Sequence, residues 1–302
     1  MKKKKLALFD VDGTLIDRNI AYELLDELYK KGLFDPAKRD VILKNRKLQN
    51  EGKMTKAHSA SEFYRLFSEG LKGKKEKEID AVADKVAQET LGKYGYKNVP
   101  EGMSMLSKRE IEPVLLSNAP GVVVRALARN ISGKARHKNK AFKMEGFGPE
   151  MEVKEGVYTG KIATYKIEKT PGLDVYTGEH LKGKELPQMF TRSGKYLFAK
   201  NVIEPKLGGE VVLGMGDSKG DLWMLLKDAD AHKTVRTPVL ITKEPELKKH
   251  AKKHGIKTFQ WHEETHKTDI RKVLEKSLPL SFSEKAVIAG LAVVLLYMLF
   301  FT

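Results

Sequence analysis

Three short apolar segments, each followed directly by polar side chains, constrain the fold of this 302-residue chain most strongly. The segments are residues 6–9, 113–116 and 211–215, and each has the length and composition of a buried strand. Between the first two, apolar residues recur with helical spacing from residue 20 to 93, around a Gly- and Lys-rich break at 70–75. Strands that alternate with helices predict an α/β protein with a parallel sheet.

Polar side chains at the ends of these strands can share one cleft, because the carboxyl ends of parallel strands lie at one edge of the sheet. In chain order they are Asp10 and Asp12, Ser117 and Asn118, and Asp217 and Asp221. Carboxylates without a soft ligand suit a hard dication, and Mg²⁺ prefers one or two carboxylates together with water and phosphate oxygens. The chain has no cysteine, which excludes a thiolate zinc site. We therefore expect Mg²⁺ as the cofactor.

The same residue types favour phosphoryl transfer. One aspartate can attack phosphorus as a covalent nucleophile, and a second acid can protonate the leaving oxygen and later activate water. A hydroxyl, backbone N–H groups and a lysine can stabilise the nonbridging phosphoryl oxygens.

Four motifs in this order resemble the haloacid dehalogenase superfamily, and within it the phosphoserine phosphatase-like branch. They are DVDGT at 10–14, LLSN at 115–118, a lysine in GKYLFAKNVIEP, and GDSKGD at 216–221. The resemblance spans residues 5–276. It implies a Rossmann-like core of residues 1–18 and 100–280 and a helical cap of residues 19–99, inserted after the first motif. A β-hairpin insert is expected within residues 144–165, where MEVKEGVYTGKI alternates around Glu155-Gly156.

The resemblance also implies roles for single residues. Asp10 would be the nucleophile that forms an aspartyl-phosphate, and Asp12 the general acid and base. Mg²⁺ would be held by the Asp10 side chain, the Asp12 main-chain carbonyl and the Asp217 side chain, with Asp221 orienting the outer shell.

Ser117 and the N–H of Asn118 would bind the phosphoryl group together with a lysine. Lys195, which follows Ser-Gly at a helix start 22 positions before Asp217, fits the family spacing better than Lys200.

Two departures from the branch concern the substrate. Asn19 stands where a glutamate that binds the amine of phosphoserine is expected, and Arg65 is only a stand-in for the arginine expected to bind its carboxylate. The expected reaction is therefore hydrolysis of a small or lipid-linked phosphomonoester rather than of phosphoserine itself.

The carboxyl end predicts a membrane attachment. Residues 286–302 are uncharged and almost wholly apolar, at the lower edge of the ~17–25 residues that span a bilayer. We interpret residues 284–302 as a single transmembrane anchor, with the catalytic part on the cytoplasmic side by the positive-inside rule. A terminal helix that packs on the domain or lies on the membrane surface is the alternative.

The net charge of +16, from 56 Lys and Arg against 40 Asp and Glu, indicates an anionic partner. The stretch from Arg125 to Lys143 contains seven cations and no acid, which suits anionic lipid headgroups. Nucleic acid is the least favoured partner, because few aromatic residues lie among these cations. His262 and His266 fit an H-E-x-x-H zinc pattern, but their charged, Lys-rich surroundings indicate a solvated surface.

Two other functions remain open at this point. A non-catalytic membrane adaptor would bind anionic partners through the basic surface. A phosphotransferase would use the same aspartyl-phosphate but exclude water.

Overall fold

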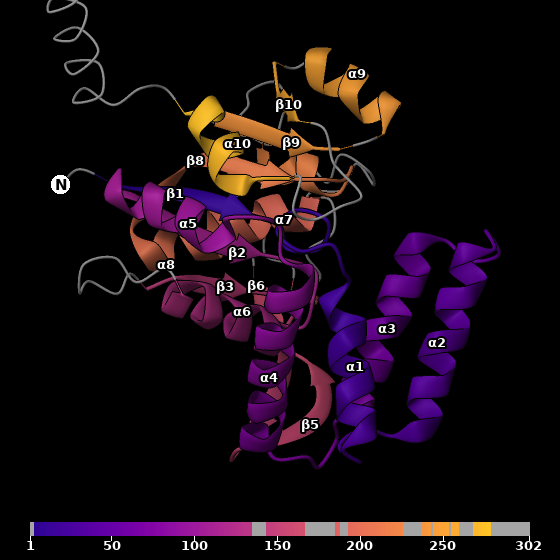
Figure 1. Cartoon of the computed structure of the whole chain (residues 1–302). Coiled ribbons are helices and arrows are strands. Elements are labelled where there is room, and N and C mark those ends of the chain that lie inside the picture. The colour runs from indigo at the N-terminus through magenta and orange to yellow at the C-terminus, as the bar shows by residue number, and fades with distance from the viewer. Residues whose placement is uncertain are drawn as a thin grey trace, which may run out of the picture.

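A computed structural model describes residues 3–134, 143–166, 185–187, 193–225, 237–242, 244–253, 255–259 and 268–278. Its centre is a six-stranded parallel sheet with the strand order β10-β9-β8-β1-β2-β3 (Figure 1). The strands are β1 (Lys4–Phe9), β2 (Ile111–Leu116), β3 (Glu145–Phe147), β8 (Gly209–Gly216), β9 (Thr237–Ile241) and β10 (Lys257–Phe259). The three predicted strands are β1, β2 and β8, and they are neighbours at the centre of the sheet.

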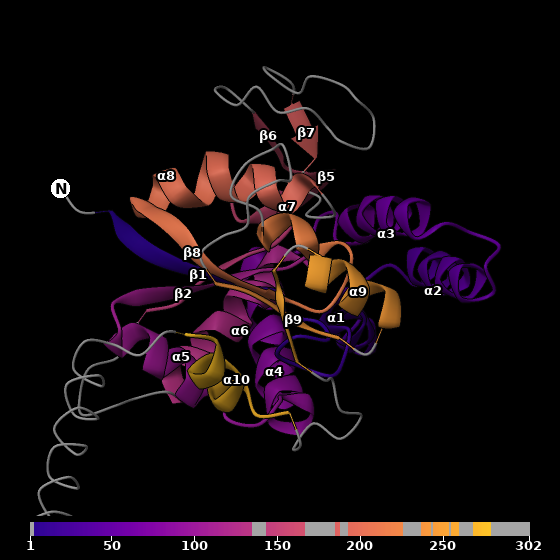
Figure 2. The ribbon, with the colours of Figure 1, turned by 90° about the horizontal axis from the view of Figure 1, so that it is seen from above.

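Alternating side chains of the strands supply two apolar layers, because successive residues of a strand point to opposite faces. In β1, Ala7 and Phe9 belong to one buried cluster and Leu6 and Leu8 to the other. The first cluster packs under α5 (Val99–Lys108), α6 (Gly121–Lys134) and α10 (Ile270–Ser277). The second packs under α7 (Ser193–Phe198), a π-helical turn (Ala199–Ile203), α8 (Glu204–Leu207) and α9 (Pro245–Lys253). Figure 2 shows α7 and α8 across the sheet from α5, α6 and α10.

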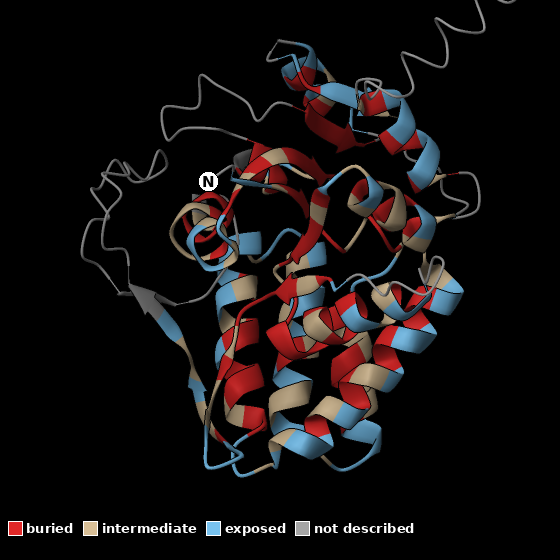
Figure 3. Cartoon of the chain, turned by 90° about the vertical axis from the view of Figure 1, so that its left-hand side faces the viewer, coloured by how far each residue is buried: buried red, intermediate tan, exposed pale blue. Residues whose placement is uncertain are grey.

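The helical stretch after the first motif forms four helices: α1 (Ile20–Lys30), α2 (Pro36–Asn50), α3 (Lys56–Gly70) and α4 (Glu76–Tyr94). The predicted break at residues 70–75 is the α3–α4 connection. Each of these helices contains buried apolar residues, and Figure 3 shows buried segments in red along the helices of the chain. Helix α4 packs along α6 of the core, and Arg129 of α6 pairs with Asp84 of α4 at 2.7 Å.

The predicted hairpin is confirmed as β4 (Met151–Lys154) and β5 (Val157–Ile162), which are antiparallel. Glu155 and Gly156 both have positive φ, as a tight two-residue hairpin turn requires. Tyr158 of β5 forms two backbone hydrogen bonds with the α3–α4 connection. Its N–H donates to the carbonyl of Lys74 at 3.0 Å, and its carbonyl accepts from the N–H of Gly73 at 2.9 Å. A second antiparallel pair consists of β6 (Thr164–Lys166) and β7 (Glu185–Pro187).

Several sequence features fall partly or wholly outside the described residues. The anchor at 284–302, the H-E-x-x-H stretch and residues 135–142 of the basic run lie there. Within the described ranges, no helix combines the length and the apolar character needed to cross a bilayer. In the described part of the basic run, Arg125 and Arg129 form ion pairs with Glu150 and Asp84.

Candidate active site

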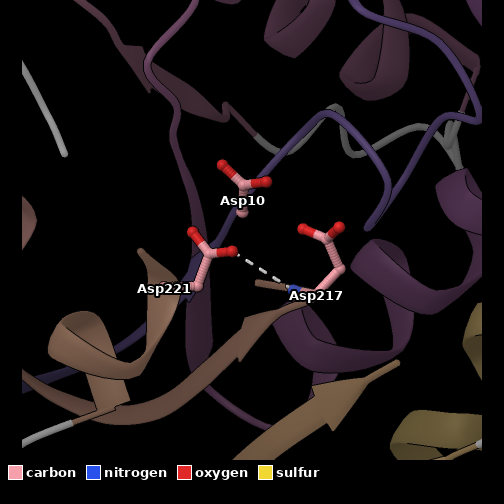
Figure 4. Close-up of side chains that lie close together, drawn as sticks. All are labelled: Asp10, Asp217 and Asp221. Atoms are coloured by element: carbon pink, nitrogen blue, oxygen red, sulfur yellow. Dashed lines mark hydrogen bonds between the residues drawn. The ribbon is translucent and has the colours of Figure 1, made fainter. Parts of the chain in front are cut away.

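Three carboxylates meet at the carboxyl edge of the sheet (Figure 4). Asp10 directly follows β1 and Asp217 directly follows β8, so the parallel pairing of these strands brings the two residues together. Asp221 begins a 3-10 helix (Asp221–Leu225). Each residue offers one carboxylate oxygen, and these oxygens lie within 4.8 Å of one another.

Lys195 is the cation of this cluster. Lys195 belongs to helix α7 and its side chain is buried. Its Nζ donates to Asp10 Oδ1 at 2.6 Å and also to Asp221 Oδ1. Lys200, the competing candidate, instead pairs with Glu204 one helical turn along the chain at 2.6 Å. The structure therefore brings Lys195, and not Lys200, to the carboxylates.

The loop after β1 needs glycine at position 13 for two reasons. Gly13 has φ +79°, and a Cβ there would lie 2.4 Å from Asp217 Oδ2. Thr14 Oγ1 donates to Asp217 Oδ1 at 3.4 Å, and the Tyr96 hydroxyl donates to the Gly13 carbonyl at 3.2 Å. The sequence analysis missed Tyr96, because nothing in its local pattern connects it with a loop 83 residues earlier.

Ser218 holds Asp221 in place. Its backbone N–H and its hydroxyl donate to Asp221 Oδ2 at 2.9 and 2.5 Å, and the N–H of Asp217 lies 3.3 Å from the same oxygen. Ser218 stands inside the GDSKGD motif but was not singled out, although serine three residues before an acid at a turn is a recognisable local hydrogen-bonding pattern.

Burial and mutual repulsion dominate the electrostatics of the cluster. Burial and the neighbouring Asp221 raise the pKa of Asp10 to about 6, although Lys195 opposes the shift. Burial, Asp221 and Asp10 raise the pKa of Asp217 well above its usual value. Against its burial, Asp221 has a lowered pKa because Lys195 and Ser218 favour its charged form. Burial would lower the pKa of Lys195, but the charges of Asp10 and Asp221 outweigh it and raise that pKa.

The cluster fits a hard divalent cation. All three donors are carboxylate oxygens, and their repulsion is relieved when a cation sits between them. Asp10, Asp217 and Asp221 are the side chains that would hold Mg²⁺.

The side chain of Asp12 is not part of this cluster and lines a cavity beside it. Its Oδ1 accepts a hydrogen bond from the N–H of Ile20, at the start of α1, at 3.0 Å. Burial and the charge of Asp10 raise the pKa of Asp12 to about 7. A carboxyl with this pKa can both give and take a proton near neutral pH.

The hydroxyl of Ser117 and the side chain of Asn118 lie next along the same edge of the sheet. Ser117 is buried, its N–H donates to Phe147 O at 3.0 Å, and its Oγ accepts from the N–H of Ala119 at 3.1 Å. The hydrogen bond from Ala119 occupies one lone pair of Ser117 Oγ, so the hydroxyl proton of Ser117 is still available for donation.

A cavity of ≈ 280 Å³ lies between the core and the cap. Asp12 and Asn118 line its core side, and α1, α2 and α3 line the rest. A larger hollow of ≈ 510 Å³ lies at the amino ends of β1 and β2, at the opposite edge of the sheet from the carboxylates.

Arg65, the arginine expected to contact substrate, is not among the residues that line the cavity next to Asp12. Its guanidinium pairs with Glu62 and Glu69 of its own helix, both at 2.8 Å, and its side chain is half exposed. Arg46 of α2 lines the cavity instead. Nothing in the sequence of α2 singles out this position, because the same helix also carries Lys38, Arg39, Lys44 and Lys47.

Comparison with known proteins gives a family match and a set of similar folds. A family model described as haloacid dehalogenase-like hydrolase matches residues 7–226. No curated protein has a significant sequence match to the chain.

Three solved structures are similar in fold. A protein with unknown function from Bordetella pertussis Tohama I has a TM-score of 0.60 at 18% identity, over 86% of this chain and 100% of that one. A substrate-bound phosphoserine phosphatase complex has a TM-score of 0.51 at 18% identity, over 92% and 100%. Cytosolic 5′-nucleotidase IIIB bound to cytidine has a TM-score of 0.53 at 13% identity, over 91% and 86%. At these identities the similarity concerns the fold.

The raised pKa of Asp12 predicts a pH-dependent gain in stability for Asp12→Asn. Ionising this half-buried carboxyl costs folding free energy that is absent below pH 3.8 and complete above about pH 7. In metal-free protein, we expect the variant to exceed the wild type in free energy of unfolding by roughly 2–4 kcal/mol at pH 8, and by little at pH 4. Urea denaturation across this pH range measures the difference. A difference that does not grow with pH would contradict the assignment.

The carboxylate cluster predicts that Mg²⁺ stabilises the folded chain. At ten times its Kd, Mg²⁺ should raise the free energy of unfolding by about 1.4 kcal/mol. Thermal unfolding with and without Mg²⁺ should show this rise in the wild type and in Asp40→Asn, an exposed control whose carboxylate is 78% accessible. The rise should vanish in Asp217→Asn. An unchanged Mg²⁺ response in Asp217→Asn would rule out the site.

Proposed function

The chain belongs to the haloacid dehalogenase-like hydrolase family, and we propose that it hydrolyses phosphomonoesters through an aspartyl-phosphate on Asp10. The main observation in support of this proposal is that two acids two residues apart, Asp10 and Asp12, lie in different surroundings. Asp10 lies in a buried cluster with Lys195, Asp217 and Asp221, whereas Asp12 lines the adjoining cavity. A nucleophile and a proton donor on opposite sides of a phosphoryl group are what ester cleavage requires.

In the first step, an oxygen of Asp10 forms a bond to phosphorus while the bond from phosphorus to the leaving oxygen breaks. Asp12, protonated in part near neutral pH because its pKa is about 7, gives its proton to the leaving alcohol. Lys195 keeps Asp10 oriented and supplies positive charge beside it. Ser117 and the N–H of Asn118 would donate to the nonbridging oxygens.

In the second step, Asp12 as carboxylate takes a proton from water, and the water oxygen attacks phosphorus. Inorganic phosphate leaves and Asp10 is restored. When bound, Mg²⁺ supplies positive charge that offsets the negative charge of the carboxylates and of the phosphoryl oxygens.

Asp10→Asn should reduce phosphate release from 4-nitrophenyl phosphate in the presence of Mg²⁺ by at least about a thousandfold, because the amide cannot form the acyl phosphate. Parallel measurement of free phosphate and of nitrophenol distinguishes hydrolysis, which releases both equally, from transfer to another acceptor. Asp40→Asn is the matched control and should retain full activity. Substantial turnover by Asp10→Asn would refute the mechanism.

We further propose that residues 284–302 attach the enzyme to a membrane, with the catalytic part on the cytoplasmic side. The uncharged stretch 286–302 supports this proposal, and it would bring the enzyme to small or lipid-linked phosphates at the bilayer surface.

The attachment predicts salt-resistant binding to lipid. The full chain should float with phosphatidylcholine vesicles at about 1 M salt, because apolar insertion is not screened whereas binding through surface charge is. A chain that ends at residue 283 should not float with the vesicles. Equal flotation of both chains, or flotation of neither, would exclude an anchor in this segment.

A further inference from the structure

We propose that the cavity beside Asp12 binds a leaving group that carries a second anionic group and no ammonium group, and that Arg46 recognises this anion. The inference rests on the proposed function and names the substrate class of the same site. It follows from the side chains that line the cavity and from the partners that these side chains lack.

The position of Arg46 follows from the periodicity of α2. Ile42, Arg46, Gln49 and Asn50 recur at helical spacing and therefore share one face of the helix. Ile42 is the only residue of α2 that is buried, and the other three line the cavity. Next to buried Ile42, helix α2 thus presents a polar stripe to the cavity, in which Gln49 is half-buried while Arg46 and Asn50 remain accessible to solvent and to a ligand.

The guanidinium of Arg46 stacks on an aromatic ring and has no acidic partner. Its central carbon lies 3.9 Å from the centroid of the Tyr22 ring. In the described part of the chain, no carboxylate lies within ion-pair distance of Arg46, whereas Arg39 and Arg65 of the cap both pair with acids. Stacking uses the face of a guanidinium and leaves its N–H edge free for a carboxylate or phosphate.

Two buried hydroxyls show that the cavity suits a polar occupant. Ser59 and Tyr64 of α3 line it and are only 4% and 3% exposed. Neither hydroxyl forms a hydrogen bond with any residue of the described ranges, although buried polar groups are nearly always satisfied. Their free hydrogen-bonding capacity therefore faces the space into which a leaving group would extend from Asp12.

The sign of the charge in the cavity selects against an ammonium group. Asp12 is the only acid among the residues lining the cavity, and the mechanism uses it for proton transfer. Asn19, at the cavity wall, is neutral, and its Oδ1 already accepts from the N–H of Tyr22 at 3.4 Å. An ammonium group would meet the charge of Arg46 with Asp12 as the sole acid among the described lining residues, while an anion would meet a cation and two hydroxyl donors.

Three-carbon esters that differ in one substituent test the proposal. Glycerol 3-phosphate and 3-phosphoglycerate differ by a hydroxymethyl group against a carboxylate, and O-phosphoserine replaces the hydroxyl of the latter by an ammonium. We expect kcat/KM for 3-phosphoglycerate to exceed that for both others by about 10- to 100-fold, the range for hydrogen bonds to a charged group. Comparison of kcat/KM for glycerol 1,3-bisphosphate and 3-phosphoglycerate shows whether the cavity prefers a second phosphate or a carboxylate.

Arg46→Met keeps an apolar side chain on Tyr22 but removes the charge, and Arg46→Gln is a second variant in case the first does not fold. Both should reduce the ratio of kcat/KM for 3-phosphoglycerate to kcat/KM for glycerol 3-phosphate to less than about threefold. Lys44→Met removes an exposed cation from the same helix outside the cavity and should keep the preference. A preference that survives in both Arg46 variants, or is lost in Arg65→Met instead, would overturn the proposal.

Calorimetry separates this inference from the proposed mechanism. Binding of 3-phosphoglycerate and glycerol 3-phosphate to Asp10→Asn protein, with and without Arg46→Met, reports recognition without turnover. Tighter binding of 3-phosphoglycerate than of glycerol 3-phosphate by the inactive Asp10→Asn protein would support the cavity assignment even if the wild type released no phosphate. Equal binding of the two esters by Asp10→Asn, alongside an active wild type, would refute the cavity assignment and leave the mechanism standing.

Discussion

Repulsion among buried carboxylates is the constraint on which the active site of this protein depends. Parallel pairing of β1 and β8 forces Asp10 and Asp217 to the same edge of the sheet, and Asp221 joins them from the next turn. Lys195 balances part of this charge by hydrogen bonding to two of the three. The remaining negative charge would favour a bound dication, and it costs stability when no cation offsets it.

The connection between core and cap runs through the same few residues. The carboxylate of Asp12 accepts from the first N–H of α1, so the proposed proton-transfer group is hydrogen-bonded to the helix that begins the cap. The ring of Tyr22, two residues further along α1, stacks on the guanidinium of Arg46. A shift of α1 relative to the core would therefore displace the proton donor and the cation together, which couples substrate recognition to the geometry of the chemical step.

The core site was predictable from the sequence, and the cap site was not. Asp10 and Asp217 follow apolar strands directly, and the geometry of a parallel sheet determines where such residues lie. The lysine could be chosen by its spacing from Asp217, and the structure places that residue, Lys195, against Asp10. Arg46 and Arg65 both stand on amphipathic helices, and only the packing of α2 against α3 decides which one faces the cavity. That packing depends on contacts between residues of different helices, which the periodicity within one helix does not reveal.

The hairpin β4–β5 has a consequence for how substrate enters. Its backbone hydrogen bonds to the α3–α4 connection join the far end of the cap to the core, while α4 is packed along α6. Lifting the cap as a rigid lid would break these bonds and expose the α4–α6 contact to water. The architecture thus opposes rigid-body opening of the cap, and an ester would have to reach the carboxylates with these contacts in place.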